Sequence, residues 1–169
     1  MPFYQQSGVL FFGSRLRRLS ESFLADVNRV YQQHGITFDA AWFPVFYMLS
    51  QKEILSIREI SGELETSHSA ASQLISKLQE KGLIRSASDK SDARKKLVAF
   101  SPKGQKLLKQ VLPVWNAMQH AMDELLAESP DTRQLMTSIL ETEKSFQRKS
   151  LYERIETHLG SENISDHKK

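Results

Sequence analysis

The sequence predicts a mainly α-helical fold with one small β-hairpin. Apolar residues recur every three or four positions over long segments on both sides of residues 83–101, which is the pattern of amphipathic helices. Between these segments, the β-prone runs LIRSA and KLVAFS flank the charged stretch SDKSDARK, a pattern typical of a hairpin and its turn. With 169 residues, 40% of them hydrophobic and 25% charged, we expect one globular domain.

A long amphipathic helix is expected first. Gly35 suits the left-handed position that follows such a helix. In the next segment, DAAWFPVFYMLS, Asp39 is a good cap, whereas Pro44 either starts the main helix or kinks it, and the sequence leaves both open. The apolar stripe of the first helix comprises Phe12, Leu16, Leu19, Phe23, Val27 and Val30.

Two shorter helices follow. Ser56 with Glu59 three residues later forms the sequence pattern of a capping box, and it starts a helix of about two turns. The next helix begins at Thr66 or Ser67 and stops at Gly82. The LETS turn between the two helices is tight, and the predicted hairpin comes directly after them. This order is that of a winged helix-turn-helix.

Long helices are expected to complete the chain. Ser101 followed by a proline predicts a helix start, and Pro130 ends this helix. One last helix is predicted to carry Leu135, Met136, Ile139, Phe146 and Ile155, followed by a flexible tail over residues 161–169.

The second helix of the helix-turn-helix has two different faces at 100° per residue. Ala71, Leu74, Ile75 and Leu78 gather on one side, and small polar residues lie opposite. Gln73 is the best candidate to read a base, since its amide pairs with adenine N6 and N7. The predicted DNA-binding residues of this helix are Ser67, His68, Ser69, Ser72, Gln73, Ser76 and Lys77.

The hairpin turn concentrates positive charge. Residues 67–110 hold ten basic and three acidic side chains, whereas the whole chain has a net charge of only +3. Such a basic segment predicts a polyanionic partner. We expect Lys90, Arg94, Lys95 and Lys96 to contact DNA phosphates, with Arg94 best placed for the minor groove. The residues expected to shape the turn are Asp89, Asp92 and Arg85.

Other function classes find little support in the sequence. It has no cysteine, no Gly-rich phosphate loop and no recognisable Ser/His/Asp arrangement, so we expect neither an enzyme nor a bound cofactor. No segment approaches the roughly 20 apolar residues of a membrane span, and the N-terminal apolar run is too short for a signal peptide. We therefore expect a cytoplasmic protein. The five histidines are widely scattered, so no metal site is predicted.

Residues 55–108 resemble the winged-helix core of the MarR family of bacterial transcriptional regulators. The most specific match is in the wing, where "KGL-hydrophobic-R", "D-x-x-D-x-R" and "[ST]-x-x-G" are present as residues 81–85, 89–94 and 101–104. The resemblance implies a DNA-binding homodimer, with dimerisation helices at 1–36 and 103–160 and a DNA-binding lobe at 37–102. Gln73 replaces a frequent basic residue, and Ala93 replaces a frequent arginine.

The resemblance also implies that a small anionic or aromatic ligand, bound in a cleft between the dimerisation helices and the DNA-binding lobe, releases the protein from DNA. The candidate ligand-binding residues are Trp42, Phe46, Tyr47 and Arg18, although such aromatics are more often plain core. The alternative to a DNA-binding regulator is a winged helix used only for protein association. The expected partners are thus double-stranded DNA, a second copy of the chain and a small ligand.

Overall fold

The computed structural model describes residues 8–88 and 95–166, with side chains described to residue 160. Internal contacts divide it into two compact units, Met1–Ala117 and Met118–Lys169. The boundary falls inside helix α6 (Pro102–Ala127). The division of one domain into terminal dimerisation helices and a central DNA-binding lobe stays a prediction.

The first unit begins with the 3-10 turn η1 (Gly8–Phe11) and the long helix α2 (Phe12–Gln33). His34 follows as its C-cap, and Gly35 adopts a φ of 64°, the left-handed conformation that glycine tolerates at a helix end. The predicted first helix and its glycine stop are therefore confirmed.

Pro44 starts a helix rather than kinking one. The 3-10 turn η2 (Ala40–Trp42) leads into α3 (Phe43–Gln51), and Pro44 lies in the first turn of α3. Proline fits there because the first N–H groups of a helix have no acceptor within it. Asp39 caps η2, and its Oδ1 accepts a hydrogen bond from the Ala41 N–H at 2.9 Å.

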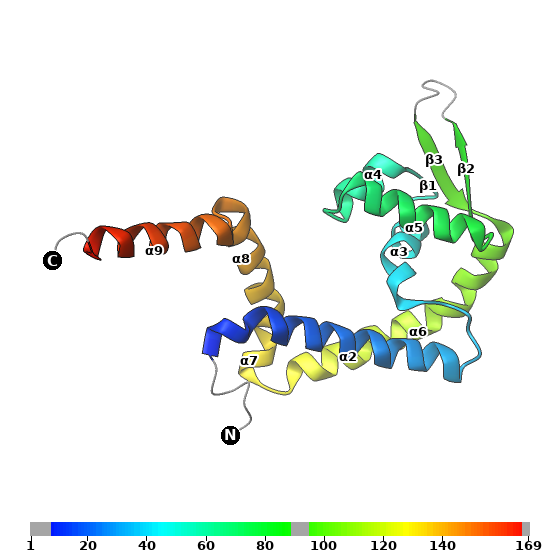
Figure 1. Cartoon of the computed structure of the whole chain (residues 1–169). Helices are drawn as coiled ribbons and strands as arrows, with labels where there is room; N and C mark the ends of the chain where they lie inside the picture. Colours follow the sequence, from blue (N-terminus) through cyan, green and yellow to red (C-terminus); the bar gives the residue numbers. More distant parts are fainter. Residues whose placement is uncertain (1–7, 89–94, 167–169) are drawn as a thin grey trace. The chain divides into compact units, whose positions relative to one another are not determined.

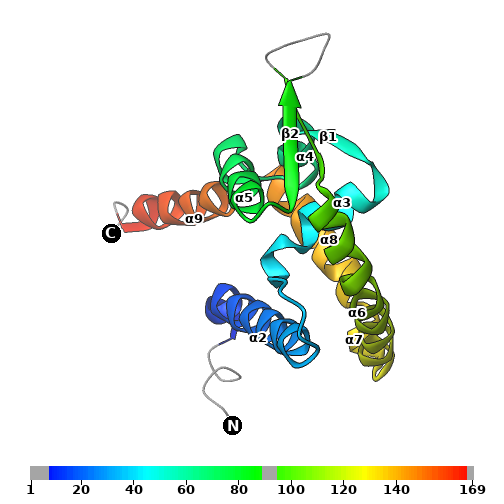
Figure 2. The ribbon, with the colours of Figure 1, turned by 90° about the vertical axis from the view of Figure 1, so that its right-hand side faces the viewer.

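The helix-turn-helix and the hairpin are present as predicted. Helices α4 (Ile57–Glu63) and α5 (His68–Glu80) precede strands β2 (Ile84–Ser88) and β3 (Lys96–Phe100). In Figure 1 and Figure 2 the hairpin extends beyond α4 and α5, away from α2.

The sequence did not indicate the third strand, β1 (Ile54–Ser56), which pairs antiparallel with β3. The sheet order is β1-β3-β2, so β3 lies in the middle. Three residues are too few to show the alternation that identifies a strand. The pairing of Leu55 with Val98 also joins positions that are far apart in the sequence.

Aromatic rings fill much of the core of this unit. Phe38 makes edge contacts with the rings of Tyr31, Trp42 and Phe46, with centroid distances of 5.0, 5.6 and 5.0 Å. The Trp115 Nε1–H donates a hydrogen bond to the Tyr31 hydroxyl at 2.9 Å and so connects α6 to α2. Burial of Tyr31 raises the pKa of its hydroxyl.

The second unit contains the end of α6, the short α7 (Pro130–Arg133), α8 (Leu135–Arg148) and α9 (Leu151–Asp166). The prediction of one last helix is wrong, because the backbone of Lys149 is extended. Ser150 starts α9 by accepting a hydrogen bond from the Glu153 N–H at 3.2 Å, and Glu153 accepts one from the Ser150 N–H at 2.8 Å. Helix α9 continues to Asp166, inside the predicted tail.

None of the side chains described in the second unit is buried. Met136 is 58% exposed and Leu140 49%, although both belong to the apolar stripe of α8. Over the part of the chain that the structure covers, no helix has the length and apolarity needed to cross a membrane.

Candidate nucleic-acid interface

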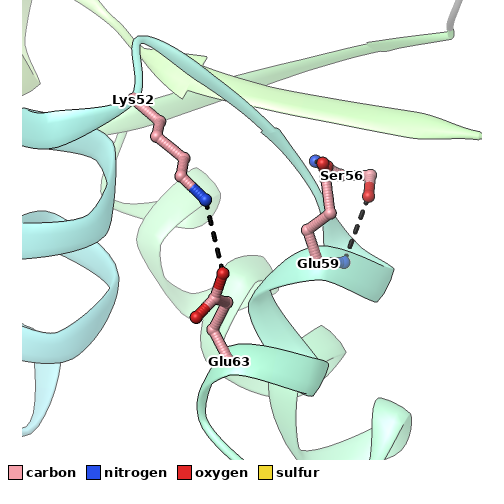
Figure 3. Close-up of polar contacts among 4 residues, drawn as sticks. All are labelled: Lys52, Ser56, Glu59 and Glu63. Atoms are coloured by element: carbon pink, nitrogen blue, oxygen red, sulfur yellow. Dashed lines mark hydrogen bonds and ion pairs between the residues drawn. The ribbon is translucent and has the colours of Figure 1, made fainter.

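Local capping fixes the first helix of the helix-turn-helix. The Ser56 Oγ accepts a hydrogen bond from the Glu59 N–H at 3.1 Å, and Glu59 Oε2 accepts one from the Ser56 N–H at 2.7 Å (Figure 3). Hydrogen bonding of the Glu59 carboxylate with the Ser56 side chain, and secondly with the Ser56 backbone N–H, lowers the pKa of Glu59. The Lys52 Nζ lies 3.3 Å from a Glu63 carboxylate oxygen in the same view, an exposed ion pair that stabilises little.

The turn between α4 and α5 is closed by backbone bonds. The Leu64 N–H donates to the Ile60 carbonyl at 3.1 Å, and the Thr66 N–H to the Ser61 carbonyl at 3.0 Å. Glu65 takes a left-handed φ of 46°, which a non-glycine residue adopts at some cost. This turn sets the direction in which α5 leaves α4.

Helix α5 presents two faces, as the angular pattern predicts. Ala71, Ile75 and Leu78 are at most 1% exposed and pack into the core. Ser72 and Leu74 are half-buried at the flanks. The side chains of the opposite face are exposed, and they include Ser69, Gln73, Ser76 and Lys77.

The N-terminus of α5 is capped by Ser67, whose Oγ accepts a hydrogen bond from the Ala70 N–H at 3.1 Å. His68 Nδ1 lies 3.4 Å from the Ser72 Oγ, one turn further along. The first turn of a helix carries partial positive charge and N–H groups that attract phosphate oxygens. This end of α5 therefore offers an anion-binding position beside the exposed polar face.

The base of the wing is described, and its tip is not. Lys96 pairs with Ser88 across the hairpin, and Lys95 and Lys96 are both exposed. Arg85 lies on β2 opposite Ala99 and is also exposed. The predicted wing residues outside the described part of the chain are Asp89, Lys90, Asp92 and Arg94.

A groove of about 510 Å³ connects the wing base to the two helices. Helix α5 contributes His68 and Ser76 to it, and the wing contributes Lys95 and Lys96. Helix α4 contributes Arg58, which the sequence reasoning missed. The only available signal was a basic residue in the first turn after a cap, and such residues are common on solvated helix faces.

Two further sets of contacts hold the interface in place. The Gln79 Nε2–H donates to the Ser86 Oγ at 2.7 Å and fixes α5 to β2. The Ser101 hydroxyl lies 2.6 Å from the Gly82 carbonyl and 3.1 Å from the Leu83 carbonyl, and the Ser101 N–H also donates to Leu83 at 3.0 Å. We name the contacts among residues 81–83 and 101–104 the Ser101 junction.

The Ser101 junction explains the glycine in the SPKG motif. The Gly104 N–H donates to the Ser101 Oγ at 3.0 Å, which caps the start of α6. A Cβ atom at Gly104 would lie 1.9 Å from the Leu83 carbonyl oxygen. Only glycine allows this approach, so the end of α5 and the start of α6 are fixed directly against each other.

The residues expected to bind a ligand lie in different places. Phe46 is fully buried, with ring centroids 5.0 Å from Phe38 and 4.9 Å from Phe100, so it belongs to the core. Trp42 is 8% exposed, whereas Tyr47 is 48% exposed and stacks on Phe43. Arg18 lines a separate depression on the N-terminal helix. Within residues 8–88 and 95–166, no three metal-ligating side chains gather into a metal site.

Comparison with known proteins agrees with this geometry. The sequence model of the MarR family matches residues 34–95, which cover α3 to β2. No curated protein sequence matches the chain.

Solved structures extend the similarity beyond this segment. The S. aureus MepR–DNA complex aligns with a TM-score of 0.67 at 18% identity, over 80% of this chain and 97% of MepR. Bordetella bronchiseptica BpsR, whose DNA binding is regulated by 6-hydroxynicotinic acid, aligns with a TM-score of 0.57 at 23% identity. The alignment covers 79% of this chain and 98% of BpsR.

A MarR variant from E. coli in complex with operator DNA aligns with a TM-score of 0.59 at 18% identity, over 79% of this chain and 96% of that one. At these identities the alignments establish the fold, and the family match covers the helix-turn-helix and half of the hairpin. The chain therefore carries a MarR-family winged helix at residues 34–95, within the fold of the MarR-family transcriptional regulators.

Proposed function

We propose that the protein is a sequence-specific, double-stranded DNA-binding transcriptional regulator that acts as a homodimer and is released from its operator by a small ligand. The observation that carries this proposal is the exposed polar face of α5, which lies beside a groove lined by Arg58, Lys95 and Lys96. Among the residues that the structure describes, no acidic side chain lines that groove.

In this proposal α5 enters the major groove. Ser69, Gln73 and Ser76 face the bases, and the Gln73 amide can pair with an adenine edge. Small serine side chains allow the helix backbone to come close to the groove floor. Lys77, at the flank of the same face, is suited to a phosphate contact.

The groove between α4, α5 and the wing suits one phosphate strand. One cation from α4 and two from the wing line it, and the neighbouring His68 adds a polar ring at the N-terminus of α5. Phosphate contacts of this kind fix the register of a protein on the duplex without reading sequence. Arg94, beyond the described part of the wing, is proposed to reach the minor groove.

Exposed apolar side chains support the homodimer. On α2, Leu16 is 47% and Leu19 61% exposed, and the apolar stripe of α8 is equally open to solvent. Contiguous apolar surface of this kind marks an interaction site. In a symmetric pair, two copies of α5 would meet successive major grooves about 34 Å apart, on a pseudo-palindromic operator.

The structural relatives point the same way. MepR and the E. coli MarR variant are bound to DNA, and BpsR is regulated by a small aromatic acid. By analogy we propose that a small ligand releases this protein from its operator, and that the protein acts in the cytoplasm, where the operator DNA lies.

The first test is the fluorescence anisotropy of labelled DNA from upstream of the protein's own gene, beside a scrambled duplex, at about 50 and 200 mM salt. Tighter binding to the native duplex that falls steeply with salt supports the proposal. A folded dimer that binds neither duplex would support the protein-association alternative.

Two variants then separate base reading from phosphate binding. Gln73→Ala should lose roughly 1–3 kcal/mol on the operator and much less on the scrambled duplex. Lys96→Ala should weaken both duplexes and reduce the salt slope by about one. Lys109→Ala, which removes an exposed lysine on α6, is the charge-matched control. Equal losses on both duplexes for Gln73→Ala would exclude it as a base reader.

Arg94→Ala is expected to weaken binding to every duplex, and an unchanged affinity would remove the wing from the mechanism.

Sedimentation equilibrium tests the oligomeric state. The wild-type protein is expected to be a dimer at micromolar concentration, and the Leu19→Glu variant a monomer. A monomeric wild type would exclude binding to paired half-sites.

A further inference from the structure

A second positively charged concavity lies away from the exposed face of α5. It is a cleft of about 400 Å³, within the range of small-molecule sites, between the loop before α3, the end of α5 and the first turns of α6. Three lysines line it, Lys81, Lys103 and Lys106, and no acidic side chain from residues 8–88 or 95–160 does so. Its apolar wall is formed by Trp42, Leu83 and Leu107.

Two of the three lysines are held in place. The Lys103 Nζ donates a hydrogen bond to the Lys81 carbonyl at 2.8 Å. The Lys81 Nζ lies over the Trp42 ring, 5.3 Å from its centroid. Lys106 lies three residues after Lys103, on the same face of α6. Because like charges at this spacing repel, an anion that bridges them is favoured.

The surroundings do not neutralise this charge. Asp39 and Glu80 line a neighbouring depression that shares Trp42 and Lys81 with the cleft, but neither carboxylate lines the cleft itself. The Lys103 and Lys106 side chains take part in none of the ion pairs found among the described residues.

We propose that this cleft binds a small multivalent organic anion, a di- or tricarboxylate or a phosphate ester, through Lys81, Lys103 and Lys106. One ammonium group per acidic group is the complementarity that such a ligand needs. Trp42, Leu83 and Leu107 contact its carbon skeleton. The ligand candidates from the sequence, apart from Trp42, lie outside this cleft.

The cleft adjoins the Ser101 junction, which gives the anion a route to α5. Lys103 binds the carbonyl of the C-cap of α5, and an anion in the cleft draws the same ammonium group towards itself. The last turn of α5 loses this anchor, and the orientation of the helix changes relative to α6. This regulatory step rests on the proposed DNA binding, whereas anion binding does not.

Calorimetric titration of the full-length protein with sodium citrate and with sodium pyrophosphate, at constant ionic strength, tests the site directly. Saturable binding of at least one anion, with one site per chain, is expected. Lys106→Gln should weaken it by about tenfold. Lys109→Gln, the same change one turn away and outside the cleft, should leave it unchanged.

The result also identifies the ligand class, since binding of citrate alone indicates a carboxylate and binding of pyrophosphate alone a phosphate ester. Absence of saturable binding of both anions, or equal weakening by Lys106→Gln and Lys109→Gln, would overturn the proposal.

The regulatory step is measured by anisotropy on operator DNA with and without the bound anion, at matched ionic strength. The anion should weaken DNA binding by the wild type and by Lys109→Gln, but not by Lys106→Gln. If Lys106→Gln weakens DNA binding without any anion, the cleft is a DNA contact and the proposal is wrong. Anion binding by a protein that binds no operator would refute the proposed function and leave the site intact.

Discussion

Replacing Gly104 by alanine sets two physical effects against each other. Gly104 is a helical residue near the start of α6, and helix propensity alone favours alanine over glycine by about 1 kcal/mol. The added Cβ would, however, lie 1.9 Å from the Leu83 carbonyl oxygen, 2.9 Å from the Leu83 carbonyl carbon and 3.0 Å from Phe100 Cδ1. Two of these atoms belong to the backbone, so the clash cannot be relieved by a rotamer change.

The magnitude follows from what has to move. Overpacking of this kind costs about 1–3 kcal/mol, and displacing Leu83 weakens its hydrogen bond from the Ser101 N–H, worth about 1 kcal/mol. After the gain in propensity is subtracted, a net loss of about 2 kcal/mol in the free energy of unfolding is expected. For a chain of this size that corresponds to a fall in Tm of about 4–8 °C.

Thermal and urea unfolding followed by circular dichroism, at one fixed protein concentration, measure this change. Gly62→Ala is the matched control, since Gly62 is also helical but nothing lies within 4 Å of the place its Cβ would take, and a gain of up to about 1 kcal/mol is expected. If Gly104→Ala is as stabilising as Gly62→Ala, the close approach at the Ser101 junction does not exist as described.

Three other changes test the local structure. Ser56→Ala removes the cap of α4 and should cost about 1 kcal/mol of unfolding free energy in urea titration; no loss would mean that the capping box is not formed in solution. The pKa of Glu59 is lower in the folded state than in the unfolded state, so the ionised carboxylate stabilises the fold at pH values above the unfolded-state pKa. This stabilisation is lost as the pH falls through the folded-state pKa. The stability difference between wild type and Glu59→Gln should therefore shrink from pH 7 towards about pH 3, and a pH-independent difference would contradict the assignment. Tyr31→Phe and Trp115→Phe each leave one buried polar group without its partner, which should cost about 1–3 kcal/mol of unfolding free energy. The double variant should therefore lose less stability than the sum of the two single losses. Strictly additive losses would exclude the hydrogen bond between the two side chains.

Local signals in the sequence were sufficient for most of the helices. Ser56 and Ser67 cap α4 and α5 through contacts with residues three positions away, and such contacts can be read within one short window. Ser150 and Glu153 form the same kind of local capping pattern, so the break before α9 is also contained in one short window of the sequence.

Local sequence patterns are enough to predict the winged helix-turn-helix and the two faces of α5, because helical periodicity fixes which side chains point the same way. The pairing of β1 with the sheet, the core position of Phe46 and the place of Arg58 beside the wing follow from tertiary packing instead. It alone also brought Lys81 to Lys103 and placed Leu83 against Gly104. These contacts join residues that are distant in sequence, and their geometry depends on how whole helices and strands pack, which no local pattern encodes.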